Sequence, residues 1–227
     1  MRFNHRTEKN NMRCIITAGP SYEKLDDVRR LTNFSSGRLG TELANFLVSR
    51  DHSVTLLIGE HATYAGERRP QSVETFSTTE SLRTLLQELA AQPVDAVFHA
   101  AAVSDFAFGK IWLRSPRGEL TEVKAGKIST RQGTLLAELV PTPKIIGELR
   151  ALYPAAKLVG WKYEVDGDRA SVVRNARQQL AQCLTDACVA NGPAYGEGFG
   201  LITGTDKHSH LADKSALFEA LEKMLRG

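Results

Sequence analysis

The chain has 227 residues, near the upper size that one hydrophobic core can fill, so we expect a single α/β domain. Its 42% hydrophobic and 24% charged content is ordinary for a soluble globular protein, and its apolar runs are too short to span a membrane. A net charge of +3 is too small to predict a nucleic-acid partner, and positive charge is expected to matter only locally, at a phosphate site. We therefore predict a protein that binds neither nucleic acid nor membrane.

Residues 1–12 are polar and mixed in charge, so we expect a disordered or tag-like start ahead of one domain over residues 13–227. The three cysteines are odd in number and lack CxxC spacing, which favours a reducing cytoplasm over disulfides or a zinc site. Cys14 and Cys188 lie in apolar runs and are expected in the core. The six histidines show no metal-ligand spacing, so we expect them at the surface and predict no metal site.

Short apolar runs alternate with amphipathic stretches along the chain. A strand at residues 13–17 is followed by a leucine stripe that predicts a helix beginning near Ser36. A strand at residues 54–58 precedes a second helix, for which Ser77 and Glu80 predict a capping box. The remaining strands are predicted at residues 96–100, 158–161 and 187–190. Two further apolar stripes predict the last helices: Val173, Ala176, Leu180 and Leu184, then Leu217, Leu221 and Leu225.

The strand runs are apolar on both faces, as in parallel sheets that helices cover on each side. Their alternation with helices predicts an α/β fold, a Rossmann-like, doubly wound and mainly parallel sheet with right-handed crossovers. Residues 106–127 break this pattern, because they alternate loosely around the turn signal of residues 115–118. We expect an inserted β-hairpin arm there. Since so thin an arm cannot bury its own apolar face, a second subunit is a natural partner and a homodimer is expected.

A glycine-bearing stretch follows the first strand, ITAGPSYEKLDDVRRLTNFSSGRLG at residues 16–40. Ligands of α/β proteins bind at this end of a strand, and the N–H groups around Ser36, Gly37 and Arg38 would face an anion. The stretch lacks the GxGxxG pattern. By itself it therefore fits an ordinary capped helix with turns equally well.

The same stretch resembles the signature of phosphopantothenate–cysteine ligases, which reads close to ITAGPTxExLDxVRxxxNxSSGxxG. Similarity continues in the same order through residues 101–105, 126–128, 142–146, 159–164 and 189–191. The resemblance implies a step of coenzyme A biosynthesis: 4′-phosphopantothenate is activated by a nucleoside triphosphate, and cysteine then attacks the acyl-nucleotidyl intermediate. It further implies Mg²⁺ with CTP or ATP as co-substrate, a cytoplasmic enzyme and a homodimer. The bacterial character of the motifs favours CTP.

Three catalytic residues are implied by position, namely Asn33, Arg29 and Lys127. Asn33 would hold the acyl oxygen, Arg29 would bind a phosphate or carboxylate through two hydrogen bonds, and Lys127 would contact the phosphates. Without the resemblance, Asn33 reads as a turn cap and Lys127 as a solvated lysine. We expect the turn of Asn33 and the loop of Lys127 to meet around the triphosphate. The nucleotide contacts implied are Gly19, Ser36, Gly37, Ala101, Ala102, Val103, Asp105, Pro143, Lys144, Ile145, Ile146 and Trp161, the last beside the base.

Several lysines of the family pattern are missing. Ser129 and Thr130 follow Lys127 where further lysines are usual, and Gln179 and Cys183 replace two lysines of the helix before the last parallel strand. Three lysines at other positions would restore positive charge: Lys124, Lys144 and Lys162. The departures leave open a diverged homologue that binds a nucleotide or phosphorylated metabolite without ligase turnover.

An NAD(P)-dependent reductase is a weaker alternative. The first turn offers only Gly19 and Pro20 in place of a GxxxGxG pattern, and Pro154 disfavours a helix through the Tyr153 and Lys157 pair. Twelve residues precede the first strand, so we expect no fused flavin-dependent decarboxylase and no flavin.

Overall fold

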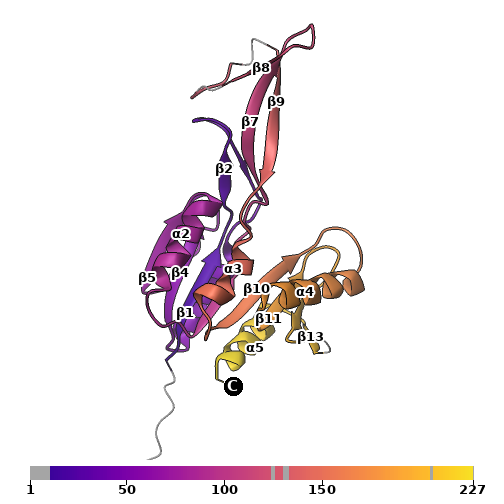
Figure 1. The fold of residues 1–227 in the computed structure, drawn as a ribbon. Coiled ribbons are helices and arrows are strands. Elements are labelled where there is room, and N and C mark those ends of the chain that lie inside the picture. The colour runs from indigo at the N-terminus through magenta and orange to yellow at the C-terminus, as the bar shows by residue number, and fades with distance from the viewer. Residues whose placement is uncertain (1–10, 124–125, 130–132, 205–206, 227) are drawn as a thin grey trace, which may run out of the picture.

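The computed structural model describes residues 11–123, 126–129, 133–204 and 207–226, which form an eight-stranded sheet, five helices and a protruding arm (Figure 1). The sheet has the order β13-β12-β11-β10-β6-β1-β4-β5. Its first six strands in sequence are parallel and the last two antiparallel, which confirms the predicted doubly wound, mainly parallel sheet. The strands are β1 (Arg13–Ala18), β4 (Ser53–Gly59), β5 (Ser72–Phe76), β6 (Ala96–His99), β10 (Lys157–Tyr163), β11 (Ala187–Asn191), β12 (Phe199–Ile202) and β13 (His208–Leu211).

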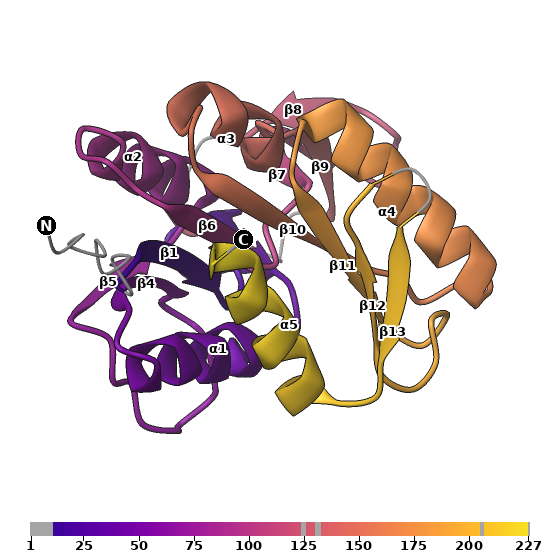
Figure 2. The same ribbon diagram turned by 90° about the horizontal axis from the view of Figure 1, so that it is seen from below.

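The helices cover both faces of the sheet (Figure 2). One face carries α1 (Arg38–Ser49) and α5 (Lys214–Arg226), and the other carries α2 (Thr79–Leu89), α3 (Ile145–Leu152) and α4 (Arg169–Cys183). Successive residues of β1 therefore enter different cores: Cys14 and Ile16 pack toward α1, whereas Ile15 packs toward α2 and α3. This two-sided burial is why the central strands read as unbroken apolar runs. In the described part of the chain no helix has the length and apolarity to cross a membrane.

The three cysteines are free and buried. Cys14 and Cys188 lie in the core as predicted, and burial raises the pKa of both thiols to about 12. Two local predictions were wrong. Thr78, not Ser77, caps α2 by accepting a hydrogen bond from the backbone N–H of Ser81. Leu184 ends α4 in a left-handed conformation with φ of 52° and is exposed, so it lies outside the apolar stripe.

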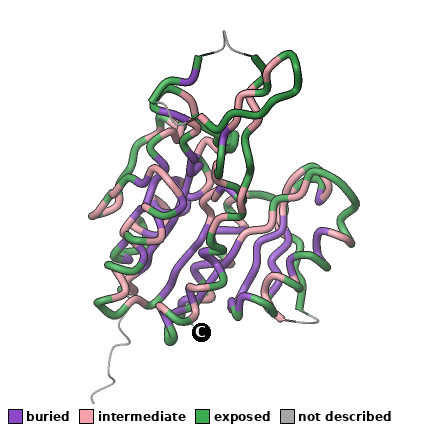
Figure 3. Tube along the Cα trace, turned by 45° about the horizontal axis from the view of Figure 1, so that its top comes forward, coloured by how far each residue is buried: buried purple, intermediate pink, exposed green. Residues whose placement is uncertain are grey.

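The arm is larger than the predicted hairpin. Its strands β7 (Phe106–Arg114) and β8 (Leu120–Glu122) pair as predicted, but the main partner of β7 is β9 (Thr134–Pro141). A shorter hairpin of β2 (Tyr22–Lys24) and β3 (Arg30–Thr32) lies beside it, and the Asp27 N–H donates to the Gly126 carbonyl at 2.9 Å. Unlike the central sheet, the arm is largely exposed (Figure 3). Its exposed apolar residues include Phe106, Leu120 and Leu139.

The predicted disordered start, residues 1–12, falls mostly outside the described residues. Its last two residues are held against the beginning of β4: Asn11 Oδ1 accepts from the Ser53 N–H at 3.0 Å, and the Met12 N–H donates to His52 Nδ1 at 3.2 Å. The predicted limits of the domain stay a prediction.

Candidate active site

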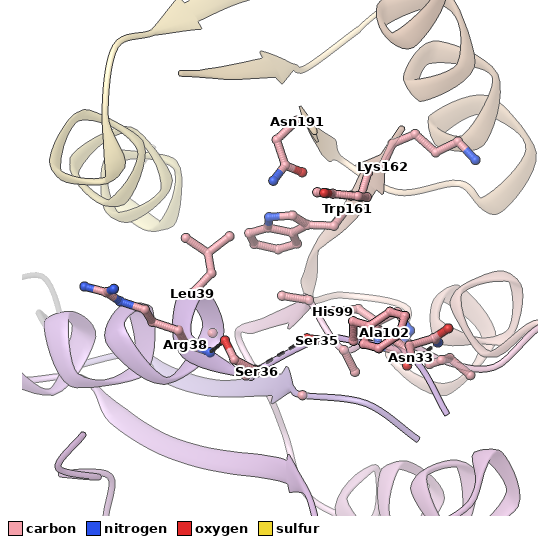
Figure 4. Close-up of a pocket in the computed structure, with 18 of the residues that line it drawn as sticks. Asn33, Ser35, Ser36, Arg38, Leu39, His99, Ala102, Trp161, Lys162 and Asn191 are labelled. Atoms are coloured by element: carbon pink, nitrogen blue, oxygen red, sulfur yellow. Dashed lines mark hydrogen bonds between the residues drawn. The ribbon is translucent and has the colours of Figure 1, made fainter. Parts of the chain in front are cut away.

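A cavity of about 830 Å³ opens at the carboxyl ends of β1, β6 and β10 (Figure 4). Its lining includes Gly19 after β1, residues 100–103 after β6, and Trp161 and Lys162 at the end of β10. The chain leaves β1 for α1 on one face of the sheet and, after the arm, leaves β6 for α3 on the other. Neighbouring strands whose connections diverge in this way create the crevice in which open α/β sheets bind ligands.

The amino end of α1 forms one wall of the cavity, through residues 33–40. Gly37 precedes the helix with φ of 77°, and a Cβ there would lie 2.9 Å from Ile58 Cδ1, so this turn requires glycine. The Ser35 and Ser36 hydroxyls accept only long hydrogen bonds, of 3.4 and 3.3 Å, from the N–H groups of Gly37 and Arg38. Ser36 and Gly37 thus lie where the sequence placed them, with the positive end of the helix dipole at the cavity.

Asn33 lines the same cavity and connects two segments of the family signature, the turn after β1 and the turn after β6. Its Nδ2 donates to the Ala102 carbonyl at 3.0 Å, and that oxygen also accepts from the Ser21 N–H at 3.1 Å. The Ala102 N–H in turn donates to the Gly19 carbonyl at 2.9 Å. The turns after β1 and β6 are therefore bonded to each other, which places Ala101, Ala102 and Val103 in the cavity wall as predicted.

Positive charge dominates the cavity lining. Arg38, Lys144, Lys162 and Lys214 come from four separate elements or their ends, whereas Asp105 is the one carboxylate among the described residues that line it. Three of these cations form ion pairs with carboxylates outside the lining, Arg38 and Lys214 with Glu42 and Lys162 with Glu164. A cluster of cations at one cavity suits a polyphosphate or another multiply charged anion.

Glu42, outside the lining, holds two of these cations. It accepts from Arg38 Nε at 2.6 Å and forms an ion pair with Lys214. Burial alone would raise the pKa of Glu42, but the hydrogen bonds from Lys214 and Arg38 outweigh it and lower the pKa. Because Glu42 stays ionised, it can fix both cations at the cavity edge.

The helix α4 faces the cavity without the lysines of the family pattern. Gln179 lines the cavity, and its Nε2 donates to the Trp161 carbonyl at 3.2 Å. Cys183 does not line it and is buried against the α2 and α3 core. Trp161 is half-buried in the lining, and its place beside a base stays a prediction.

His99 is a site residue that the sequence reasoning missed. It ends β6, is 7% exposed and lines the cavity, so the prediction that all six histidines lie at the surface was wrong for it and for His52, which is 1% exposed. Burial lowers the pKa of His99 to about 4, and its Nδ1 lies 2.9 Å from Thr17 Oγ1. Its place directly before the small residues 100–103 was the one available signal.

A smaller hollow of about 70 Å³ adjoins the cavity. Pro143 and Ile145, both predicted nucleotide contacts, line this hollow and not the larger one. The two hollows share five lining residues: His99, Val103, Asp105, Lys144 and Ile146. They are therefore neighbouring compartments of one site.

Two predicted catalytic residues do not line the cavity. Arg29 pairs with Asp26, with Nη2 to Oδ2 at 2.5 Å, and donates to the Ile128 carbonyl at 2.9 Å. Lys127 is exposed beside this contact, beyond the far end of β2 and β3. Arg29 and Lys127 are thus near each other, but within one chain the structure does not place Lys127 with Asn33 around the cavity. Their catalytic roles stay a prediction.

The fold and the cation-lined crevice define the class of the protein: a Rossmann-like α/β protein with a cavity where its strand connections diverge. The family model for the "DNA/pantothenate metabolism flavoprotein C-terminal domain" matches residues 9–225. The chain belongs to this family, which confirms the resemblance found in its motifs.

Named relatives support this placement. The coenzyme A biosynthesis bifunctional protein CoaBC of Thermococcus kodakarensis is 32% identical over 224 residues, covering 94% of this chain and 51% of that protein. The chain spans about half the length of the curated relatives it matches first.

Solved structures share the fold. The DNA/pantothenate metabolism flavoprotein of Streptococcus pneumoniae superimposes with a TM-score of 0.81 at 25% identity, covering 95% of this chain and 98% of that one. A Cab2 mutant in complex with phosphopantothenate-cysteine superimposes with a TM-score of 0.72 at 19% identity, covering 96% and 88%.

Proposed function

We propose that the chain joins 4′-phosphopantothenate to L-cysteine in coenzyme A biosynthesis, using a nucleoside triphosphate to activate the carboxylate. The observation that carries this proposal is the cavity, because the signature segments 33–40 and 101–105 meet there among four cations. The names of the relatives point the same way, since one acts in coenzyme A biosynthesis and one is bound to phosphopantothenate-cysteine.

The chemistry sets two requirements. In the first step a carboxylate oxygen attacks the α-phosphorus and pyrophosphate leaves, so two anions must approach each other and cations must offset their repulsion. In the second step the cysteine amine attacks the acyl carbonyl, loses a proton and expels the nucleoside monophosphate. Asn33 is suited to orient the acyl oxygen, and Arg38, Lys144, Lys162 and Lys214 line the cavity that would hold the phosphates. No electron is transferred, so the proposed reaction requires no flavin.

Mg²⁺ fits this site as a partner of the nucleotide. Mg²⁺ keeps waters and phosphate oxygens as most of its ligands and takes one or two carboxylates from a protein. Asp105 supplies one carboxylate in the lining, and Ser35 and Ser36 line the same cavity. The metal would neutralise phosphate charge and so reduce the repulsion between the two anions. We propose CTP as the nucleotide. A thermal-shift panel of CTP, ATP, GTP and UTP with Mg²⁺ tests this, because the specific nucleotide raises Tm most.

We further propose a homodimer formed through the arm. Its support is the exposed apolar surface of β7, β8 and β9, which an arm of three strands cannot bury by itself. A dimer would also explain the placement of Arg29 and Lys127, which lie by the arm and outside the cavity of their own chain. We propose that they serve the cavity of the second copy. The proposed compartment is the cytoplasm, in keeping with three unpaired cysteines.

Mixed dimers test this arrangement. Asn33→Ala and Arg29→Ala should each inactivate the enzyme, but mixing the two should restore activity, because one site of each mixed dimer would carry neither change. If Arg29 serves its own chain, every site of the mixed dimer is damaged and mixing restores nothing.

The function itself is tested by pyrophosphate release. The proposal requires release that depends on both phosphopantothenate and nucleotide, and product formation that also depends on cysteine. The competing function, nucleotide or phosphometabolite binding without turnover, is favoured by Gln179 and Cys183 in place of lysines. Tight nucleotide binding with no pyrophosphate release under any combination of substrates would select that alternative.

A further inference from the structure

We infer that His99 is a hydrogen-bond donor to the nucleobase and helps to set which nucleotide the site accepts. This inference rests on the proposed function, because it presumes a nucleotide in the cavity. It gives a role to a residue that the family pattern does not include among the nucleotide contacts.

The hydrogen bonds around Thr17 determine which ring nitrogen of His99 carries the proton. Thr17 is fully buried, and its Oγ1 accepts from the Ala101 N–H at 3.1 Å. The same oxygen lies 2.9 Å from His99 Nδ1. If Nδ1 also donated, the buried hydroxyl hydrogen would have no acceptor in the described part of the chain. The hydroxyl therefore donates to Nδ1, and the proton of the neutral ring sits on Nε2.

The Nε2–H group is available for a ligand. His99 lines both hollows, and its Nε2 has no hydrogen-bond partner among the described residues. Side chains alternate along β6, so His99 lies on the same face as Val97, toward α3. Since burial lowers the pKa of His99 to about 4, the ring is uncharged at neutral pH and acts as a directional donor.

The two hollows suit different parts of a nucleotide. The larger one holds the amino end of α1 and four cations, the features that bind phosphates. The smaller one adds Pro143 and Ile145 to Val103 and Ile146, which line both hollows, and the one cation that lines it, Lys144, is shared with the larger hollow. A nucleotide with its phosphates in the larger hollow would thus direct its uncharged base toward the smaller one. His99 stands at the junction, where Nε2–H would meet a ring nitrogen or carbonyl oxygen of the base.

The experiment compares nucleotide binding with binding of inorganic tripolyphosphate, which lacks a base. Titrations with Mg²⁺ and without phosphopantothenate measure Kd for wild type, His99→Leu, His99→Gln and Thr17→Val. We expect His99→Leu to weaken the preferred nucleotide about tenfold and to leave tripolyphosphate unchanged. His99→Gln keeps an N–H donor and should stay within about threefold of wild type. Thr17→Val removes the partner of Nδ1 and also the acceptor of the Ala101 N–H, and it should weaken nucleotide binding less than His99→Leu does.

The outcomes separate the two proposals. If His99→Leu weakens the binding of nucleotide and of tripolyphosphate equally, His99 has a structural role and the inference is overturned. If wild type binds nucleotide and His99→Leu binds it with the same Kd, the inference is overturned and the proposed function stands. No binding of any nucleotide by wild type would remove both.

A measurement on the unmodified protein avoids the risk of a misfolded variant. Nitrogen-15 NMR of the wild type should show His99 neutral at pH 7 with its proton on Nε2. A proton on Nδ1, or a charged ring, would overturn the inference.

Discussion

Asn33 Nδ2 donates a hydrogen bond of 3.0 Å to the carbonyl oxygen of Ala102, and this bond joins two segments that lie far apart in the sequence. The acceptor belongs to the turn after β6, and the donor follows β3 on the way to α1. A side chain held in this way has a defined orientation before any ligand arrives, as an active-site group requires.

We expect Asn33→Ala to lower kcat/KM by roughly 100-fold, the loss typical of removing one preorganised donor. Asn45→Ala is a matched control, because Asn45 also donates to a backbone carbonyl, that of Glu67 at 2.8 Å, but lies outside the cavity. Steady-state kinetics with both variants, alongside their Tm values, provide the test. An equal loss of activity in both variants would show that Asn33 acts only through stability.

Asp26 should make stability depend on pH in the acid range. Its carboxylate pKa is lowered, first by the hydrogen bonds from the Arg29 side chain, against an opposing effect of burial, and further by backbone N–H groups of Ile128, Val28 and Arg29. A lowered folded-state pKa stabilises the protein above the unfolded-state pKa, about 3.9, and this contribution is lost as pH falls toward the folded-state value.

We therefore expect Asp26→Asn to lower Tm by a constant amount above about pH 5 and by a shrinking amount below about pH 4. Thermal unfolding of both proteins from pH 3 to 7 measures this difference. A difference that does not change with pH would mean that the charge of Asp26 contributes nothing to it.

Gln179→Lys should restore a cation on the α4 side of the cavity. We expect the nucleotide Kd to fall by about threefold to tenfold at low salt, and the gain to diminish as ionic strength rises. Gln179→Met is the control, because it removes the same hydrogen bond to Trp161 without adding charge. Isothermal titration at two salt concentrations measures the effect. Gln179→Lys binding no better than Gln179→Met would show that α4 lies too far from the phosphates.

The Gly37 turn should resist any side chain. Gly37→Ala places a Cβ at φ of 77° and 2.9 Å from Ile58 Cδ1, so we expect a loss of about 1–2 kcal/mol in unfolding free energy together with weaker nucleotide binding. Gly147→Ala is the opposite case, since its added Cβ in α3 meets nothing within 4 Å. That variant should gain up to about 1 kcal/mol from helix propensity. Denaturant unfolding of both variants tests the contrast, which equal effects would contradict.

The central strands β1, β4, β6, β10 and β11 were predictable because their sequence signals are local, whereas β5, β12, β13 and α3 were not predicted. Strands buried on both faces read as apolar runs, and helices packed on one side read as stripes. The failures occur where tertiary structure decides. The residues of β9 carry no turn signal that would mark them as the main partner of β7, and Leu184 completes an apolar stripe but lies past the end of α4.

The site was predictable where its residues belong to a long motif. Asn33, Gly37 and Ala102, which belong to recognised segments, line one cavity, and their roles stay predictions. His99 was missed because a single histidine before small residues has no local pattern, and its importance depends on Thr17, which pairs with it across β1 and β6. Arg29 and Lys127 show the reverse: their motifs were recognised, but both residues lie outside the cavity of their own chain.

The position of β1 has a consequence for how the chain reaches its native state. Cys14 pairs with Val54 on one side and with Ala96 on the other, and β6 in turn pairs with β10. The middle of the sheet is therefore assembled from partners that are distant along the polypeptide, and each pairing must overcome a large loop-closure entropy. Folding is expected to be slow for a chain of this length. The segment from β1 to β5 would form early, and its apolar β1 edge would stay open until β6 arrives, which makes that edge the point most exposed to misassembly.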